Sequence, residues 1–212
     1  MRVMPGNHSS PLIHYWAGKY PEKLGWLFGP SAVDKTKIRD WLPFALDNDA
    51  FTAWVKNKPW DQSAWESMIA KIKMSGKTPL WAIVPDVVSD KHATIENWDK
   101  YKGTISKHKW PLAFAVQDGM DERDVPADAD VVFVGGTTEW KWKTVDQWAK
   151  SFRRVHVGRV NSLEKIMFCE SLGIESVDGT GWMRGTIEHS QQGKDLKQWI
   201  EGNAKNNQLS LF

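Results

Sequence analysis

The chain has 212 residues, of which 41% are hydrophobic and 25% charged, a composition typical of one globular domain. The net charge of +2 at pH 7 is too small to identify a nucleic-acid-binding protein, although a local basic face is compatible with it. The single cysteine excludes an intrachain disulfide and a zinc site built on several cysteines. We see no signal peptide and no apolar run of membrane length, so we expect a cytoplasmic protein that does not enter the membrane.

Short apolar runs recur along the chain and predict eight strands. Several are continuous rather than alternating, which is typical of strands covered on both faces. The predicted strands are 12–17, 26–29, 43–47, 80–85, 112–117, 131–134, 154–158 and 175–178.

Amphipathic segments between these runs predict helices at 61–76, 89–108, 144–152, 161–173 and 193–203. The first of them has Asp61 or Ser63 as its N-cap and Gly76 as its stop. Ser162 is expected to cap the helix at 161–173. Cys169, inside the apolar pattern of that helix, is expected to be a small buried side chain.

Alternation of strands and helices predicts a parallel α/β fold. No glycine-rich dinucleotide fingerprint follows the first predicted strand. A compact (βα)8 TIM-like barrel is therefore preferred over an open doubly wound sheet. Without a visible linker, repeat or low-complexity stretch, residues 1–212 are expected to form a single domain.

Polar residues or glycines follow six of the predicted strands, where a barrel would bring them to one face. An Asp after a strand is more often a turn former or a helix cap, and Asp49 is expected to have only the capping role. Six such ends in one chain, three of them Asp, nevertheless favour a site. The residues concerned are Asp47, Asp86, Gln117, Gly135, Gly136, Gly158, Arg159 and Asp178.

Three carboxylates without metal ligands suit the chemistry of a glycosidic bond, with one as nucleophile, one as acid and base, and one binding substrate. Paired glycines let the backbone approach a flat ligand. A glutamine offers the donor and the acceptor that a purine edge requires.

The ordered segments DNDAF, PD, VQDG, VGG, HVGR and VDGT, between residues 26 and 182, resemble the tRNA-guanine transglycosylase family. The resemblance is greater to its DpdA branch, which inserts 7-deazaguanine bases into DNA in phages and bacterial modification islands. Asn48, Asp49, Ala50 and Asp118 depart from the family's motifs. The zinc subdomain of the tRNA enzymes is expected to be absent, because the chain has one cysteine.

The resemblance implies that guanine in DNA is exchanged for a 7-deazaguanine base such as preQ0 through a covalent aspartyl intermediate, without a cofactor. A partner protein or a homodimer is compatible with this, and a phage-encoded enzyme would act in the host cytoplasm. Asp178 would be the nucleophile and Asp47 the acid and base. The base would be bound by Asp86, by Gln117 at its edge, by backbone donors of Gly135 and Gly136, and by Val157 and Gly158 beneath it.

Basic residues in the second half of the chain are candidates for phosphate contacts: Arg159, Arg184, Lys141 and Lys143. Trp140, Trp142 and Trp182 are candidates for stacking on displaced bases, although core packing is the more common role of tryptophan. His156 alternates with apolar residues inside a predicted strand and is expected to be a hydrogen-bonded core histidine.

Two alternatives stay open. The first is a tRNA-guanine transglycosylase that binds its RNA with a separate partner chain. The second is a catalytically inactive barrel that binds only nucleic acid or a deazapurine. Asp178 distinguishes a catalytic from a binding protein, because only the former needs its carboxylate.

Overall fold

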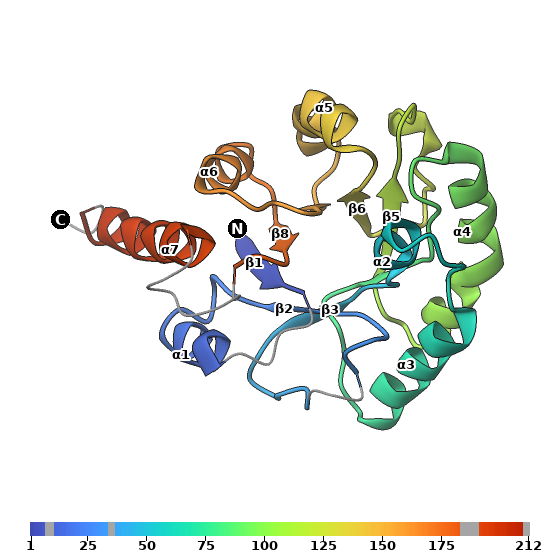
Figure 1. The fold of residues 1–212 in the computed structure, drawn as a ribbon, viewed down its shortest axis with the longest axis horizontal. Helices are drawn as coiled ribbons and strands as arrows, with labels where there is room; N and C mark the ends of the chain where they lie inside the picture. The colour runs from blue at the N-terminus through green and yellow to red at the C-terminus, as the bar shows by residue number, and fades with distance from the viewer. Residues whose placement is uncertain (7–10, 34–36, 183–190, 210–212) are drawn as a thin grey trace.

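A computed structural model describes residues 1–6, 11–33, 37–182 and 191–209, and for residues 11–13 and 203–209 it describes the backbone alone. Eight short strands alternate with helices along this part of the chain (Figure 1). The strands are β1 (Arg2–Pro5), β2 (Trp26–Phe28), β3 (Phe44–Leu46), β4 (Ala82–Ile83), β5 (Leu112–Val116), β6 (Val131–Val134), β7 (Val155–Val157) and β8 (Ser176–Gly179).

All pairings in the sheet are parallel, and the strand order is β1-β8-β7-β6-β5-β4-β3-β2. Backbone hydrogen bonds also join the two ends of this order. The amide of Val3 donates to the carbonyl of Lys23 (2.8 Å), and the amide of Gly25 donates to the carbonyl of Val3 (3.0 Å). The strands therefore form a nearly closed TIM-like barrel, as predicted.

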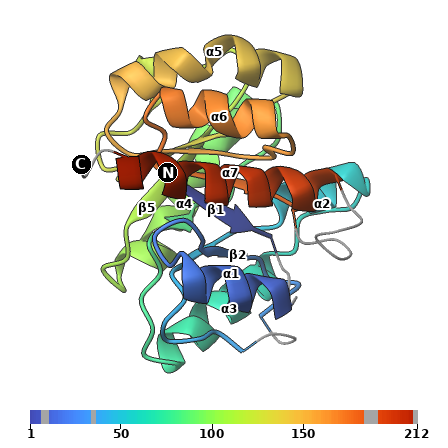
Figure 2. The ribbon, with the colours of Figure 1, turned by 90° about the vertical axis from the view of Figure 1, so that its left-hand side faces the viewer.

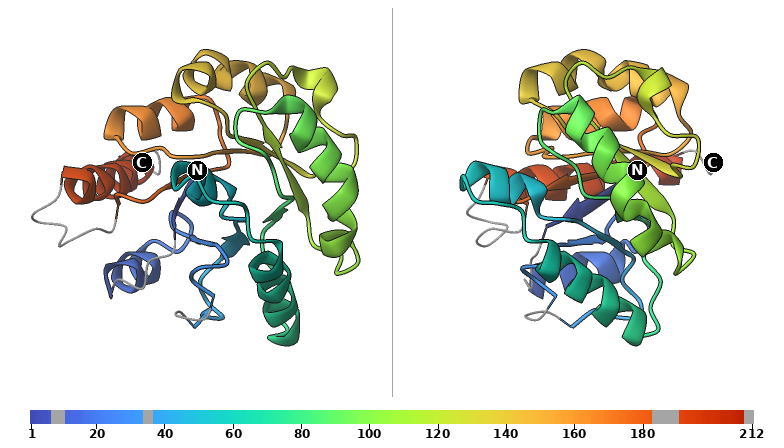
Figure 3. Two further views of the ribbon diagram at one scale, coloured as in Figure 1. Left: turned by 45° about the vertical axis from the view of Figure 1, so that its right-hand side comes forward. Right: turned by 90° about the vertical axis from the view of Figure 1, so that its right-hand side faces the viewer.

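Most of the helices lie outside the ring of strands (Figures 2 and 3). Asp61, Asp90, Thr137 and Ser162 cap four of them by accepting a hydrogen bond from a backbone amide in the first turn. The helices are α1 (Pro11–Lys19), α2 (Ala50–Val55), α3 (Gln62–Met74), α4 (Lys91–Ser106), α5 (Thr138–Ser151), α6 (Leu163–Ser171) and α7 (Gln191–Leu209), with a 3-10 turn η1 at Glu122–Asp124.

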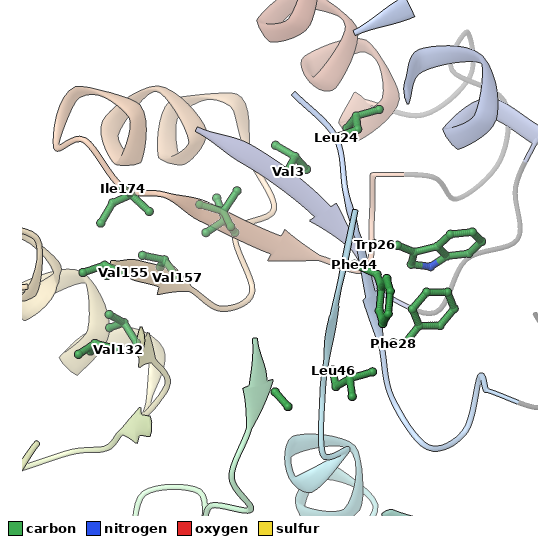
Figure 4. Packing of buried hydrophobic residues seen from close by; sticks show 14 of the residues in the cluster. Val3, Leu24, Trp26, Phe28, Phe44, Leu46, Val132, Val155, Val157 and Ile174 are labelled. Atoms are coloured by element: carbon green, nitrogen blue, oxygen red, sulfur yellow. The ribbon is translucent and has the colours of Figure 1, made fainter. Parts of the chain in front are cut away.

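Each strand buries side chains on both of its faces. In β1, for example, Val3 packs in the layer between strands and helices, whereas Met4 packs inside the barrel. Figure 4 shows part of the outer layer, in which Trp26 stacks on Phe28 with ring centroids 4.8 Å apart. The barrel interior is filled by Met4, Leu27, Ala45, Trp81, Ile83, Ala113, Ala115 and Val131.

The predicted strand at 12–17 is wrong, because this segment lies within helix α1. Trp16 and Ala17 are adjacent in sequence and both pack in the outer layer. Two neighbouring residues can face the same side of a helix but not of a strand. The first strand is β1, at residues 2–5, so α1 supplies the helix that the predicted pattern lacked between its first two strands.

The other seven predicted strands match β2 to β8 within two residues at each end. Helix α5 begins at Thr138, six residues before its predicted start. Among the described residues, no helix has both the length and the apolar character needed to cross a bilayer.

Candidate active site

A cavity of about 490 Å³ lies at the carboxyl ends of the strands. Asp47 follows β3, Asp86 follows β4 and Asp178 belongs to β8, and all three carboxylates line this cavity. The barrel thus brings together three acidic residues that are far apart in sequence. The remaining lining residues are Asn48, Phe51, Thr52, Ile83, Val88, Gln117, Phe133, Gly135, Gly136, Thr138, Arg159, Asn161, Ser162, Lys165 and Thr180.

Asp178 is held by hydrogen bonds at both carboxylate oxygens. Its Oδ1 accepts from the backbone amide of Arg159 (3.1 Å), and its Oδ2 lies 3.1 Å from Nε2 of His156. Nδ1 of His156 in turn lies 2.8 Å from the hydroxyl of Ser176. We assign the imidazole proton to Nε2, so that the Ser176 hydroxyl donates to Nδ1 and the ring donates to the carboxylate.

His156 is fully buried. Its ring stacks on Phe133, with centroids 4.7 Å apart and planes at 27°, and meets the ring of Trp81 edge-on at 4.8 Å. The prediction of a hydrogen-bonded core histidine is confirmed. Sequence reasoning missed its contact with Asp178, although residues 156 and 178 lie on adjacent parallel strands.

Asp86 lies between two side-chain amides. Nδ2 of Asn48 donates to its Oδ1 and Nε2 of Gln117 donates to its Oδ2, each at 2.8 Å. Burial raises the pKa of Asp86 above its usual range, and these hydrogen bonds oppose the increase. The two amides hold the carboxyl plane in one orientation.

The amide of Gln117 is itself fixed, because its Oε1 accepts from the backbone amides of Ser89 (3.0 Å) and Gly136 (3.1 Å). This corrects one expectation. The N–H of Gly135 also donates inside the protein, to the carbonyl of Val116 (3.1 Å). The glycine amides predicted to bind the carbonyl of a base therefore already have partners. Because they have no side chains, Gly135 and Gly136 leave space in the cavity wall.

The carboxyl group of Asp47 has a strongly raised pKa. Burial, together with the nearby carboxylates of Asp49 and Asp178, raises this pKa to about 8. One opposing contact is the amide of Asn48, which donates to Oδ1 of Asp47 (2.8 Å). At neutral pH this carboxyl group is mostly protonated and can donate a proton.

Asp49 is the N-cap residue of α2, as expected, but its side chain makes no capping hydrogen bond. Oδ1 of Asn48 accepts from the amide of Ala50 (2.7 Å), at the start of α2. The carboxylate of Asp49 instead accepts from the amide of Ser31 (3.0 Å). Asn48 thus connects the start of α2 to Asp86, a role that sequence reasoning missed.

Arg159 lies at the cavity with its backbone at φ +59°, a conformation uncommon for residues other than glycine. Its guanidinium donates to the carbonyl of Gly136 and lies over the ring of Phe51, 4.2 Å from the ring centre. Burial lowers its pKa, although it remains charged at neutral pH.

Lys141 is buried rather than positioned for a phosphate contact, so this expectation is corrected. Its side chain is 1% exposed, and its ammonium group donates to the carbonyl of Gly158. Burial, together with the nearby charge of Arg159, lowers the pKa of Lys141 to about 7. Lys141 thereby supports the residue immediately before Arg159, whose amide holds Asp178.

The resemblance implied that a base rests on Val157 and Gly158. The side chain of Val157 cannot contact a base in the cavity, because it packs in the outer layer between the barrel and the helices (Figure 4). That part of the expectation is wrong. Gly158 does approach the site. A Cβ atom there would meet the ring of Phe133 at 2.9 Å and Oδ2 of Asp178 at 3.3 Å, so a larger residue would crowd the carboxylate.

The other candidates for nucleic-acid contacts are spread apart. Lys143 is exposed on α5 and pairs with Glu139 (2.6 Å), whereas Arg184 lies outside the described residues. Trp182 is buried, and Trp140 and Trp142 pack partly buried against the core. The expected stacking of these tryptophans on bases is therefore not supported by their exposure.

Among the described residues, no group of three or more His, Cys, Asp and Glu side chains is arranged to hold a metal ion. The fold and the site together define a TIM-like barrel with an acidic cavity at the carboxyl ends of its strands. No protein-family model matches the chain, and no curated protein matches it either.

Proposed function

We propose that this chain is a base-exchanging transglycosylase that replaces guanine in DNA by a 7-deazaguanine derivative. The observation that carries the proposal is the convergence of Asp47, Asp86 and Asp178 on one cavity, each in a different environment. Two carboxyl groups with separate roles and a third that binds the base suit such an exchange.

Asp178 is the proposed nucleophile. One of its oxygens attacks C1′ of the target nucleotide while the bond from C1′ to N9 of guanine breaks. The hydrogen bonds from Arg159 and His156 keep the carboxylate in one orientation, which favours attack by reducing the motion lost on reaction. A carboxylate suits an exchange because it is also a good leaving group in the second step.

Asp47 is the proposed acid and base. With a pKa of about 8, it begins protonated at neutral pH and transfers its proton to the departing guanine. The incoming base then loses its N9 proton to Asp47, N9 bonds to C1′, and the bond between C1′ and Asp178 breaks. After one exchange, the proton is again on Asp47 and the carboxylate of Asp178 is free.

Asp86 is the proposed contact to the amino group and ring N–H of the base. Each of its oxygens accepts one hydrogen bond from the protein and retains capacity for a second. The ring of Phe133 and the apolar side chain of Ile83 also line the cavity and suit the flat faces of a base. The volume of about 490 Å³ lies within the range of about 300–1,000 Å³ usual for small-molecule sites.

The choice of DNA as substrate rests on the resemblance to the DpdA branch and on the single cysteine of the chain. A target base inside a duplex would first have to leave the stack, at a cost of roughly a few kcal/mol. A single-stranded target avoids that cost.

The test is to incubate the protein with isotope-labelled preQ0 and either guanine-containing DNA or tRNA, and to measure labelled nucleosides by mass spectrometry. We expect label in DNA with the wild type and none with Asp178→Asn. Asp146→Asn is a matched control, because Asp146 lies on α5 and pairs with Lys150 (3.0 Å). Label in tRNA alone would favour the tRNA enzyme, and no label in either would favour a binding protein.

A further inference from the structure

Helix α2 presents exposed aromatic side chains beside the cavity. Trp54 is 55% exposed and Phe51 is 37% exposed, and their ring centroids are 5.7 Å apart. Aromatic rings of this size are usually buried, so a pair of exposed rings on one short helix suggests a binding surface. In Figure 2, α2 lies at the edge of the molecule toward which the β1 arrow points.

The aromatic pair is continuous with the cavity. The side chain of Phe51 lines it, and the guanidinium of Arg159, another lining residue, lies over the Phe51 ring, 4.2 Å from its centre. A strand of nucleic acid whose target nucleotide enters the cavity would pass over this rim. Trp54 lies one helical turn farther from the cavity, where the next base would lie.

The charge of this segment also favours a polyanion. Residues 51–58 contain Lys56 and Lys58, both exposed, and no Asp or Glu. Among the described residues, no carboxylate lies within ion-pair distance of either ammonium group. Proteins bind single-stranded nucleic acids by combining aromatic rings, on which bases stack, with neighbouring cations that contact the phosphate backbone.

We propose that Phe51, Trp54, Lys56 and Lys58, here called the α2 surface, bind the single-stranded DNA that flanks the target guanine. A neighbouring base stacks on Trp54, and Lys56 and Lys58 contact phosphates. The choice of DNA rests on the proposed function, whereas the stacking surface itself rests on the exposure and charge of these residues.

The test uses the Asp178→Asn protein, so that binding is measured without base exchange. A fluorescein-labelled single-stranded DNA oligonucleotide with one guanine is titrated with this protein. The same titration is done with three further variants of it, which carry Trp54→Ala, Trp54→Phe, or both Lys56→Ala and Lys58→Ala. Trp41→Ala is the matched control, because Trp41 is 49% exposed but precedes β3, at the opposite end of the strands from the cavity.

Loss of one stacking contact predicts a Kd about 5- to 150-fold weaker for Trp54→Ala, with Trp54→Phe close to the parent and Trp41→Ala unchanged. Loss of two phosphate contacts predicts a slope of log Kd against log salt that is lower by about 1.4. Quenching of tryptophan fluorescence by the oligonucleotide should also decrease in Trp54→Phe.

Equal affinities of Trp54→Ala and Trp41→Ala would overturn the proposal. Markedly tighter binding of the matching RNA would also overturn it. So would the finding that Trp54→Ala abolishes self-association in sedimentation while the affinity for the oligonucleotide stays unchanged. Failure of base exchange in the wild type would refute the proposed enzyme but not the α2 surface, since the binding assay involves no chemistry.

Discussion

Nε2 of His156 lies 3.1 Å from Oδ2 of Asp178, and both residues are buried on adjacent parallel strands. Ser176, on the other side of the imidazole, completes a chain of three side chains that ends at the cavity. In the proposed reaction, the developing ester at Asp178 keeps one oxygen that can accept from this imidazole. In that reaction, His156 would be a positioning residue for the proposed nucleophile.

Replacing His156 by Phe should keep the stacking on Phe133 but remove the donor to Asp178. A lost hydrogen bond to a charged group predicts a kcat for exchange about 10- to 100-fold lower, with KM for the incoming base little changed. Ser176→Ala should have a smaller effect, because it removes only the partner that orients the ring. Steady-state kinetics of label incorporation measures both. An unchanged kcat in His156→Phe would refute this role.

Replacing Asp47 by Asn should stabilise the folded protein at neutral pH while abolishing exchange. The pKa of Asp47 is raised from 3.8 to about 8, so between these values the folded state holds a proton that the unfolded state has lost. The free energy of unfolding therefore falls as pH rises through this window, by up to about 1.4 kcal/mol per pH unit. Asn cannot ionise and escapes this loss.

Chemical denaturation at several pH values measures this difference for Asp47. The two proteins should be about equally stable near pH 4, with Asp47→Asn increasingly more stable up to about pH 8. Asp146→Asn should show no such trend. A constant difference between Asp47→Asn and the wild type across the window would contradict a raised pKa.

Replacing Lys141 by Met tests its buried ammonium group. The pKa of Lys141 is lowered from 10.5 to about 7, so the unfolded state holds more protons between these values. The stability that Lys141 contributes should therefore rise with pH across that window. Loss of the bond to Gly158 should lower kcat about tenfold without changing the salt dependence of DNA binding. A lower salt slope would instead indicate a phosphate contact.

Replacing Gln117 by Leu should destabilise the protein and disorder Asp86. The change leaves the amides of Ser89 and Gly136 without their acceptor and one oxygen of Asp86 without its donor. Unpaired buried groups of this kind predict a loss of about 2–4 kcal/mol in the free energy of unfolding. Gln198→Leu, at an exposed position on α7, should change it by less than about 0.5 kcal/mol. Equal denaturation midpoints would contradict this.

Most strand positions were predictable because β2 to β6 are compact apolar runs bounded by turn residues. Asp47, Asp86 and Asp178 were identified by one rule, that polar side chains at carboxyl ends of barrel strands meet. The first strand was missed because Val3 and Met4 stand between Arg2 and Pro5 without a longer apolar run around them, whereas the apolar run at 12–17 gave a stronger signal.

The details of the site were less predictable, because they depend on contacts between distant residues. Nothing local to Lys141 distinguishes it from Lys143, two residues later. Lys141 is buried and Lys143 is exposed because of the way α5 packs against β7. The glycine amides of residues 135 and 136 looked available in sequence, but the partners that engage them lie on β5 and at Gln117.

In the proposed reaction, Asp178 forms a covalent bond to the sugar of a guanine nucleotide. The most direct measurement is denaturing electrophoresis of the protein after reaction with a guanine-containing DNA oligonucleotide, followed by mass spectrometry of the digested adduct. The proposed reaction predicts a protein–DNA adduct that lacks guanine, is attached at Asp178, is absent from Asp178→Asn and is released by added deazaguanine. An adduct that persists in Asp178→Asn, or base exchange by that variant, would contradict it.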